Sequence, residues 1–188
     1  MVRLWNVVIV GGVLTVLMGS CAYVDPENGS LRLEEANRVL IALAHPDDDT
    51  WLSGSLAKLA ESGAQVIVVY ATSGGAGSDY SGEGLSGDAL SRVREEEAVR
   101  SLTVLGVKEP PIFLRLPDGD LAKHSESFSA ALVGLIERFQ PQVLISFGGD
   151  GITGHKDHIT VSTVVVDLVN TMAEKISVAE VELCQGMV

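Results

Sequence analysis

Two short clusters of histidine and aspartate stand far apart in the sequence, and both contain side chains that bind divalent metals. Residues 45–49 read HPDDD and residues 154–158 read GHKDH. Three neighbouring carboxylates resist simultaneous ionisation unless a cation lies among them. His155 and His158 are three positions apart, so at the start of a helix they face the same side. Together the clusters offer the His/Asp/His ligand set of a catalytic zinc ion, with further acid and base groups for metal-assisted hydrolysis.

The elements that must position these clusters are alternating strands and helices. Apolar or β-branched runs predict strands at 39–44, 65–70, 112–116, 143–147 and 178–183. The stretches between them predict helices at about 51–62, 88–105, 126–139 and 156–173, with a glycine- and serine-rich loop over 72–87. This alternation predicts an α/β fold, a Rossmann-like and mostly parallel sheet with helices on both faces.

Both clusters directly follow predicted strands, the first after 39–44 and the second after 143–147. An H-x-x-H pair on a helix or a run of aspartates in a turn is by itself common on protein surfaces. Ligands of parallel α/β sheets, however, bind at the carboxyl ends of the strands. We therefore expect the two clusters to meet at one edge of the sheet and to form one site.

A glycine pattern in the same region formally matches a dinucleotide-binding fingerprint. Gly149, Gly151 and Gly154 have the spacing G-x-G-x-x-G between a predicted strand and a predicted helix. The fingerprint needs an acidic residue at the end of the next strand, about 20 residues later, and here that distance falls inside the helix. We therefore interpret the glycines as allowing close approach of the backbone to a bound substrate.

The composition narrows the class of protein. The chain has 188 residues, of which 46% are hydrophobic and 20% charged, which suits one domain with a core and excludes a disordered or fibrous chain. Its net charge of −12 repels phosphate backbones and argues against a nucleic-acid partner. Two cysteines, Cys21 and Cys184, are too few for a disulfide scaffold or a four-cysteine zinc site.

The first 21 residues have the pattern of a secretory signal. Arg3 precedes an apolar run at 7–18 that is short for a membrane span. Residues 17–21 (LMGSC) resemble a bacterial lipobox, in which Cys21 would be lipidated. The alternative is an uncleaved N-terminal anchor helix.

We therefore predict three segments: a signal peptide at 1–21, a linker at 22–36 and the functional domain at 37–188. This division predicts an exported or cell-envelope location. Membrane tethering would use either the lipidated cysteine or the N-terminal helix.

The two clusters resemble the signatures of the PIG-L/LmbE-like family of zinc-dependent N-acetylglucosaminyl deacetylases. Residues 44–48 (AHPDD) follow a predicted strand, and residues 154–158 (GHKDH) stand late in the chain. The resemblance covers about residues 37–173. Between the signatures it extends to 68–75 (VVYATSGG), to Arg94-x-x-Glu97 with LGV at 105–107, and to 116–121 (LPDGDL).

The resemblance assigns a role to each residue of the clusters. Asp47 would be the general base, and a protonated His155 would stabilise the oxyanion or donate to the leaving amine, with Asp157 orienting its ring. Zn²⁺ is the implied metal, and Fe²⁺ suits the same donors. Three side chains would bind the metal: His45, Asp48 and His158.

The implied reaction removes an acetyl group from an N-acetylated amino sugar or glycoconjugate. Arg94 and the loop over 74–87 would contact the sugar; alternatively, Arg94 forms a surface ion pair with neighbouring glutamates. Hydrolysis of another amide or ester and a non-catalytic exported paralogue stay open as alternatives. Family members usually continue past the second histidine motif, so we expect a complete set of metal ligands and only part of the substrate wall. The resemblance specifies neither the sugar nor an oligomeric state.

Overall fold

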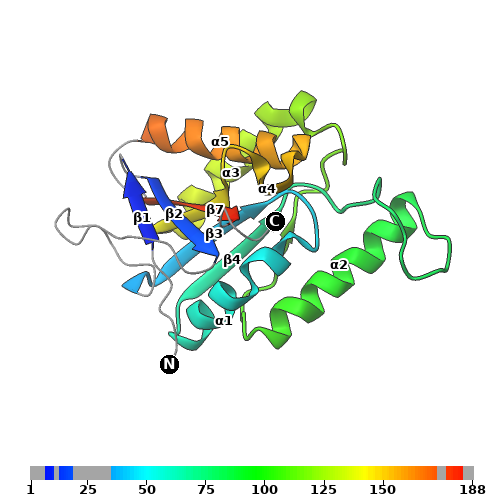
Figure 1. Cartoon of the computed structure of the whole chain (residues 1–188), viewed down its shortest axis with the longest axis horizontal. Coiled ribbons are helices and arrows are strands. Elements are labelled where there is room, and N and C mark those ends of the chain that lie inside the picture. The colour runs from blue at the N-terminus through cyan, green and yellow to red at the C-terminus, as the bar shows by residue number, and fades with distance from the viewer. Residues whose placement is uncertain (1–6, 11–12, 19–34, 173–176, 184–188) are drawn as a thin grey trace.

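A seven-stranded sheet forms the centre of the molecule (Figure 1). The computed structural model describes residues 7–10, 13–18, 35–172 and 177–183. The strand order is β1-β2-β7-β6-β3-β4-β5, and every neighbouring pair is parallel except β1 and β2. The strands are β1 (Val7–Val10), β2 (Val13–Met18), β3 (Arg38–Leu43), β4 (Gln65–Tyr70), β5 (Ile112–Phe113), β6 (Val143–Phe147) and β7 (Ser177–Leu183).

Helices cover both faces of the sheet, with α1 and α2 on one side and α3 and α5 on the other (Figure 1). They are α1 (Ser53–Glu61), α2 (Gly87–Val104), α3 (Ser125–Phe139), α4 (Gly151–Gly154) and α5 (Lys156–Met172). Two 3₁₀ helices, η3 (Asp48–Leu52) and η4 (Leu121–His124), lie between them. The α/β fold with a mostly parallel sheet and helices on both faces is therefore confirmed.

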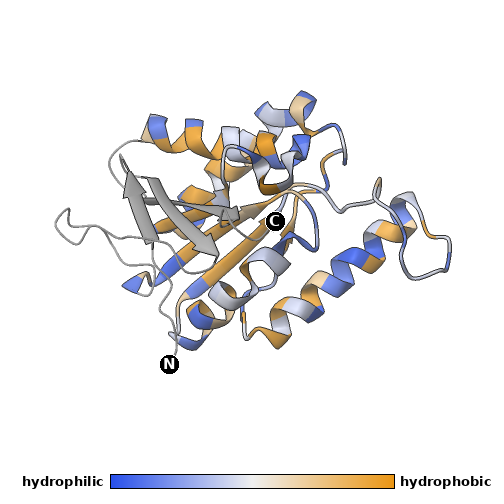
Figure 2. Ribbon diagram, in the orientation of Figure 1, coloured by the Kyte–Doolittle hydropathy of each residue, from blue (hydrophilic) through white to orange (hydrophobic). Residues whose placement is uncertain are grey.

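The central strands are apolar because they are buried on both faces (Figure 2). All five residues of β6 are buried, and so are all residues of β3 and β4 after the first. The side chains of α1, α3 and α5 that pack against them are also apolar and include Leu56, Phe128 and Val161. This packed centre holds the carboxyl ends of three adjacent strands in a fixed arrangement.

The predicted elements agree with the structure except at the strand over 112–116, the short helix α4, the two 3₁₀ helices and the strands β1 and β2, which were not predicted. β4 and β6 have the predicted bounds, whereas the strand expected over 112–116 ends at Phe113. The chain leaves the strand there because Arg115 has a φ of 55°, outside the range of a strand. The sequence analysis did not predict α4, which contains a left-handed Ile152 with a φ of 63°.

Within the segment predicted as a signal peptide, the described residues 7–10 and 13–18 form two strands, β1 and β2. β2 pairs in parallel with β7 at the edge of the sheet. No helix of the described part of the chain is long and apolar enough to cross a membrane. Cleavage after the signal stays a prediction, and it would remove both strands. Cys21 and residues 22–34 of the expected linker lie outside the described residues.

The chain order changes direction at β3, which lies between β4 and β6. From β3 the chain passes outward to β4 and β5, and then returns to β6 on the other side. Such a switch point opens a crevice at the carboxyl ends of the strands, where α/β proteins bind their ligands. The loops after β3 and β6, which carry the two clusters, both border this crevice.

Candidate metal centre and active site

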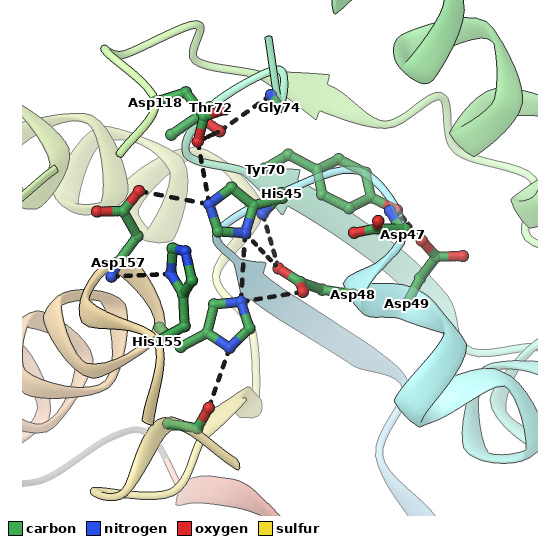
Figure 3. Close-up of polar contacts among 12 residues, drawn as sticks. His45, Asp47, Asp48, Asp49, Tyr70, Thr72, Gly74, Asp118, His155 and Asp157 are labelled. Carbon is green, nitrogen blue, oxygen red and sulfur yellow. Dashed lines mark hydrogen bonds and ion pairs between the residues drawn. The ribbon is translucent and has the colours of Figure 1, made fainter. Parts of the chain in front are cut away.

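Three side-chain donors converge between the loops after β3 and β6 (Figure 3). Nδ1 of His45 lies 3.2 Å from Nε2 of His158 and 3.5 Å from Oδ2 of Asp48. Nε2 of His158 lies 3.1 Å from Oδ1 of the same aspartate. Ligands of a tetrahedral zinc ion are separated by roughly 3.4 Å at usual bond lengths. These donors therefore fit a single divalent metal.

Local structure orients the two donors nearest the loop backbone. The backbone N–H of His45 donates to Oδ2 of Asp48 at 2.7 Å, which closes a tight turn after β3. Nδ1 of His158 lies 3.0 Å from the carbonyl oxygen of Gly151, so this nitrogen donates and Nε2 is left as the metal-binding atom. The ring of His158 also stacks on Phe147 at the end of β6, with ring centroids 4.2 Å apart. A side chain at Gly151 would come within 3.0 Å of Cβ of His158, which explains the glycine.

Two carboxylates hold the other side of the His45 ring. Nε2 of His45 lies 3.1 Å from Oδ1 of Asp118 and 3.4 Å from Oδ2 of Asp157 (Figure 3). A carboxylate on the second ring nitrogen is the usual partner of a metal-binding histidine, because it fixes the tautomer and the direction of the ring. Asp157 is fully buried and also accepts the backbone N–H groups of Gly119 and Leu121, at 2.7 and 3.2 Å.

Two other triads lie close enough together to be considered as metal ligands, and both include His45. In the triad with Asp118 and Asp157, backbone N–H groups already bind both carboxylates. The triad with His155 and His158 replaces the carboxylate by an exposed imidazole. We favour the set with Asp48, because its carboxylate faces both imidazoles and balances the charge of a cation.

Without a metal, the histidine and the aspartates of the site have pKa values shifted in opposite directions. Burial would lower the pKa of His45, but its hydrogen bonds to Asp118 and Asp48 raise it to about 10. Burial opposes ionisation of both aspartates as well. Hydrogen bonds from His158 and His45 nevertheless hold the pKa of Asp48 well below its usual range, and His45 lowers the pKa of Asp118 to about 2. A metal must therefore displace the proton of His45.

Asp47 lies beside the metal donors and points to a different partner. It has a left-handed backbone, with a φ of 111°, and its carboxylate accepts a hydrogen bond from Nη2 of Arg94 at 2.6 Å. Burial raises the pKa of Asp47 and the guanidinium of Arg94 opposes the rise. Because 59% of its side chain is exposed, solvent weakens both of these effects on the carboxylate.

His155 lies next to the two metal-binding imidazoles, with its ring centroid 4.8 Å from that of His45. Its Nδ1 accepts the backbone N–H of Asp157 at 3.2 Å. Burial and the nearby imidazoles of His45 and His158 lower the pKa of His155. Because Nδ1 accepts this N–H, the neutral ring carries its proton on Nε2; the protonated ring expected from the resemblance stays a prediction.

A cavity of about 500 Å³ opens over these residues. Its wall includes the three metal donors together with Asp47, Arg94, Asp118 and His155. The cavity brings a candidate metal position, a carboxylate and an imidazole into one solvent-accessible space, which is the arrangement needed for metal-assisted hydrolysis.

Comparison with known proteins decides the family. A family model described as GlcNAc-PI de-N-acetylase, PIG-L, matches residues 40–169. The chain belongs to the PIG-L family. This PIG-L chain is 34% identical over 175 residues to a 1D-myo-inositol 2-acetamido-2-deoxy-alpha-D-glucopyranoside deacetylase of Corynebacterium diphtheriae, and the match covers 77% of this chain and 57% of the relative.

Solved structures show the same fold. The N,N'-diacetylchitobiose deacetylase from Pyrococcus horikoshii superposes with a TM-score of 0.63 at 27% identity, covering 78% of this chain and 53% of that one. A 4-carboxy-2-hydroxymuconate hydratase from Pseudomonas putida superposes with a TM-score of 0.51 at 21% identity, covering 76% and 62%. The fold therefore also occurs in a protein with another activity. The PIG-L chain spans about half the length of the relatives it matches.

The structure brings the seven residues singled out from the sequence to one cavity or its immediate border. They are His45, Asp47, Asp48, Arg94, His155, Asp157 and His158. Asp157 differs from expectation because its carboxylate contacts His45 and the 119–121 backbone, and only its backbone N–H contacts His155. Arg94 lines the cavity, and its described partners are Asp47 and the carbonyl of Gly74, not neighbouring glutamates.

Asp118 is the site residue that the sequence analysis did not single out. It lies on the loop after β5 and contacts His45, the backbone N–H of Ala76 and the hydroxyl of Thr72. A carboxylate at the carboxyl end of a strand in the same sheet was the available signal, because both clusters were found by that criterion.

Proposed function

We propose that this PIG-L chain is a metal-dependent amidohydrolase that removes the acetyl group from an N-acetylated amino sugar or glycoconjugate. The observation that carries the proposal is the convergence of His45, Asp48 and His158 on one metal position, with Asp47 and His155 beside it in the same cavity. The family match and the deacetylases among the similar proteins support the same reaction.

Two imidazoles and one carboxylate would hold the metal, and this donor set suits Zn²⁺ first and Fe²⁺ second. A divalent metal bound there polarises the amide carbonyl and lowers the pKa of a water molecule toward ~7. Asp118 and Asp157 keep Nδ1 of His45 directed at the metal position by binding Nε2. The chain itself supplies the proton transfers.

Asp47 accepts the proton of the attacking water. Arg94 contacts Oδ2 of Asp47, so we assign the proton transfer to Oδ1. A carbon–oxygen bond to the water forms, and the carbon–nitrogen bond of the amide breaks. The proton then passes to the leaving nitrogen, which gives acetate and a free amine. General-base catalysis of this kind contributes about 10²- to 10⁴-fold.

His155 stabilises the charge that develops on the carbonyl oxygen. Its Nδ1 accepts the N–H of Asp157, so Nε2–H is the available donor. A preorganised donor of this kind acts without a positive charge on the ring, which agrees with the lowered pKa of His155.

The test is acetate release by the full chain after loading with Zn²⁺ or Fe²⁺, from a panel of N-acetylated amino sugars and glycosides. We expect Asp47→Asn to retain the metal and lose about 10²-fold or more in kcat. The matched control is Asp167→Asn, an exposed carboxylate on α5. Equal turnover by Asp47→Asn and the unaltered protein would refute this mechanism. Turnover of other amides or esters alone would favour a hydrolase of a different bond. No turnover of any substrate would favour a non-catalytic exported paralogue.

We further propose that the domain is exported and attached to the cell envelope, with residues 1–21 as a lipoprotein signal that is cleaved before Cys21, so that Cys21 becomes the lipidated first residue. The basic and apolar pattern of the segment and the LMGSC sequence support this. Fractionation of cells producing the full chain tests it. A membrane-associated protein that Cys21→Ser releases is the expected result, and a protein that keeps its first 21 residues contradicts it.

A further inference from the structure

Glu95 is a half-buried carboxylate of α2 that has no role in the proposed chemistry. The hydroxyl of Ser73 donates to its Oε1 at 2.5 Å. Arg115 donates from Nε to Oε1 and from Nη2 to Oε2, both at 2.9 Å. Such a bidentate arginine–carboxylate pair has a specific geometry as well as charge. Glu95 therefore links α2 to two loops, the one after β4, which carries Ser73, and the one after β5, which carries Arg115.

Both loops that Glu95 links also hold the carboxylate of Asp118. On the loop after β4, the backbone N–H of Ala76 donates to Oδ2 of this aspartate at 2.7 Å, and the hydroxyl of Thr72 donates to Oδ1 at 3.4 Å. The loop after β5 carries the aspartate itself, three residues after the arginine. Its Oδ1 lies 3.1 Å from Nε2 of His45 (Figure 3). A shift of either loop would therefore move the carboxylate that orients a proposed metal ligand.

The ion pair lies at a backbone conformation that needs support. Arg115 has a φ of 55°, in the left-handed region, which residues with a Cβ keep only where surrounding contacts impose it. The backbone N–H groups of its neighbours, Leu114 and Leu116, donate at 2.9 Å to carbonyl oxygens at the end of β4 and just after it. The side chain of Arg115 adds the contact with Glu95 on the opposite element, α2. The turn that leads to the site carboxylate is thus held from two elements.

The same helix carries an ordinary surface ion pair for comparison. Nη1 of Arg100 lies 3.6 Å from Oε2 of Glu96, and both side chains are more than half exposed. Such pairs contribute little, because solvent screens them and both side chains lose freedom. The carboxylate of Glu95 is only 16% exposed, binds its arginine in two places and holds a serine of another loop as well. These features indicate that Glu95 restrains loop positions, which an isolated surface pair does not.

We propose that Glu95 is a positioning residue of the metal centre. By linking the loops after β4 and β5 to α2, it keeps Asp118 against His45 and so increases the affinity of the site for its metal. Glu95 does not line the metal cavity, so it acts through Asp118 and not on the substrate. This inference rests on the metal site of the proposed function, but it is tested by metal binding and needs no turnover.

The experiment measures the Zn²⁺ affinity of the full chain by competition with a chromogenic chelator. Glu95→Ala is expected to weaken Zn²⁺ binding about 5-fold, less than the loss of about 10- to 100-fold that is usual for a direct partner of a metal-binding histidine. Glu95→Gln keeps an acceptor for Ser73 and loses the charge that faces Arg115, so its affinity is expected between the two. The matched control is Glu96→Ala, which removes the exposed neighbouring carboxylate and is expected to keep the affinity.

A double-mutant cycle separates positioning from a general loss of structure. If Glu95 acts through Asp118, then adding Glu95→Ala to Asp118→Asn causes no further loss of Zn²⁺ affinity. Additive losses overturn the proposal, because they show that Glu95 affects the site by another route. Arg115→Ala changes a side chain that is 68% exposed and is expected to weaken Zn²⁺ binding as Glu95→Ala does. It carries the test if Glu95→Ala does not fold.

The outcomes distinguish this inference from the proposed function. Zn²⁺ affinity that depends on Glu95 and is coupled to Asp118 supports the inference even if the chain deacetylates no ligand. Unchanged Zn²⁺ affinity in folded Glu95→Ala and Arg115→Ala overturns it even if the unaltered chain is an active deacetylase. Failure of the unaltered chain to bind Zn²⁺ at all overturns the inference together with the metal site.

Discussion

Two neighbouring loops at the same edge of the sheet are built in opposite ways. The β3–α1 loop, residues 44–52, buries His45, Asp48 and Asp49, and each of these side chains has at least two described partners. The β4–α2 loop, residues 71–86, is buried as far as Gly74 and is mostly exposed after it, including Tyr80 near its middle. Metal chemistry needs donors held to within a fraction of an ångström. The first loop has the fixed side chains that such chemistry requires, and the exposed part of the second loop does not.

Removing one of the three proposed metal ligands is expected to have the largest effect. His158→Ala leaves one imidazole and one carboxylate, and we expect loss of stoichiometric metal and of turnover by about 10³-fold or more. Metal analysis of the purified protein and acetate release measure the two effects. His124→Ala, on η4, is the matched control and is expected to retain the metal. Full metal content in His158→Ala would contradict the ligand assignment.

Metal binding is expected to strengthen steeply with pH. The pKa of His45 is raised from 6.5 to about 10 without a metal, so below about pH 10 each bound metal displaces one proton from this ring and the affinity rises about tenfold per pH unit. In the metal-free protein, the charged ring of His45 adds to the free energy of unfolding. This contribution is fully present below pH 6.5 and is lost as the pH rises toward about 10.

The carboxylate of Asp118 acts in the opposite direction. Its pKa is lowered from 3.8 to about 2, so its contribution to the free energy of unfolding is present above pH 3.8 and is lost on acidification toward pH 2.

The raised pKa of His45 makes a prediction for thermal unfolding. Because metal binding strengthens with pH, the difference in Tm between the zinc-loaded and the chelator-treated protein is expected to widen from pH 6 to pH 8. A constant difference over that range would mean that His45 is already neutral without metal.

Asp118→Asn tests the outer support of the same metal loop. The asparagine side chain keeps the shape of the aspartate but removes the negative charge next to Nε2 of His45. We therefore expect the metal affinity to fall about 10- to 100-fold. Competition with a chromogenic chelator measures this directly. Asp120→Asn, two residues away and paired with Lys123 on the surface, is expected to keep the affinity. Equal affinities for the two variants would leave Asp157 as the sole carboxylate support.

The smallest effect is expected from the anchor of the β3–α1 loop. Tyr70→Phe removes the hydroxyl that donates to Oδ1 of the buried Asp49 at 2.9 Å, and we expect a loss of about 1–2 kcal/mol in the free energy of unfolding. Asp79→Asn, in the exposed β4–α2 loop, is expected to change this free energy less. Urea unfolding compares them, and a larger effect of Asp79→Asn would reverse the contrast between the loops.

The sequence determined the fold class and the edge on which the site lies. Continuous apolar runs such as 143–147 predict strands buried on both faces, and polar clusters that directly follow such strands are expected at the carboxyl edge of the sheet. The strand over 112–116 was overestimated, because the apolar pattern continues past Phe113 although Arg115 turns the backbone. The apolar pattern carries no information about such a turn, at which the side chain of Arg115 pairs with Glu95 of α2.

The tertiary structure alone decided what each of three consecutive aspartates does. Asp47 faces Arg94 of α2, Asp48 faces His45 and His158, and Asp49 binds Tyr70 and Ser101 in the interior. Adjacent residues of identical chemistry are indistinguishable to composition and periodicity. They diverge here because the left-handed backbone at Asp47 and the 3₁₀ turn that follows direct the three side chains toward elements more than 20 residues away in sequence.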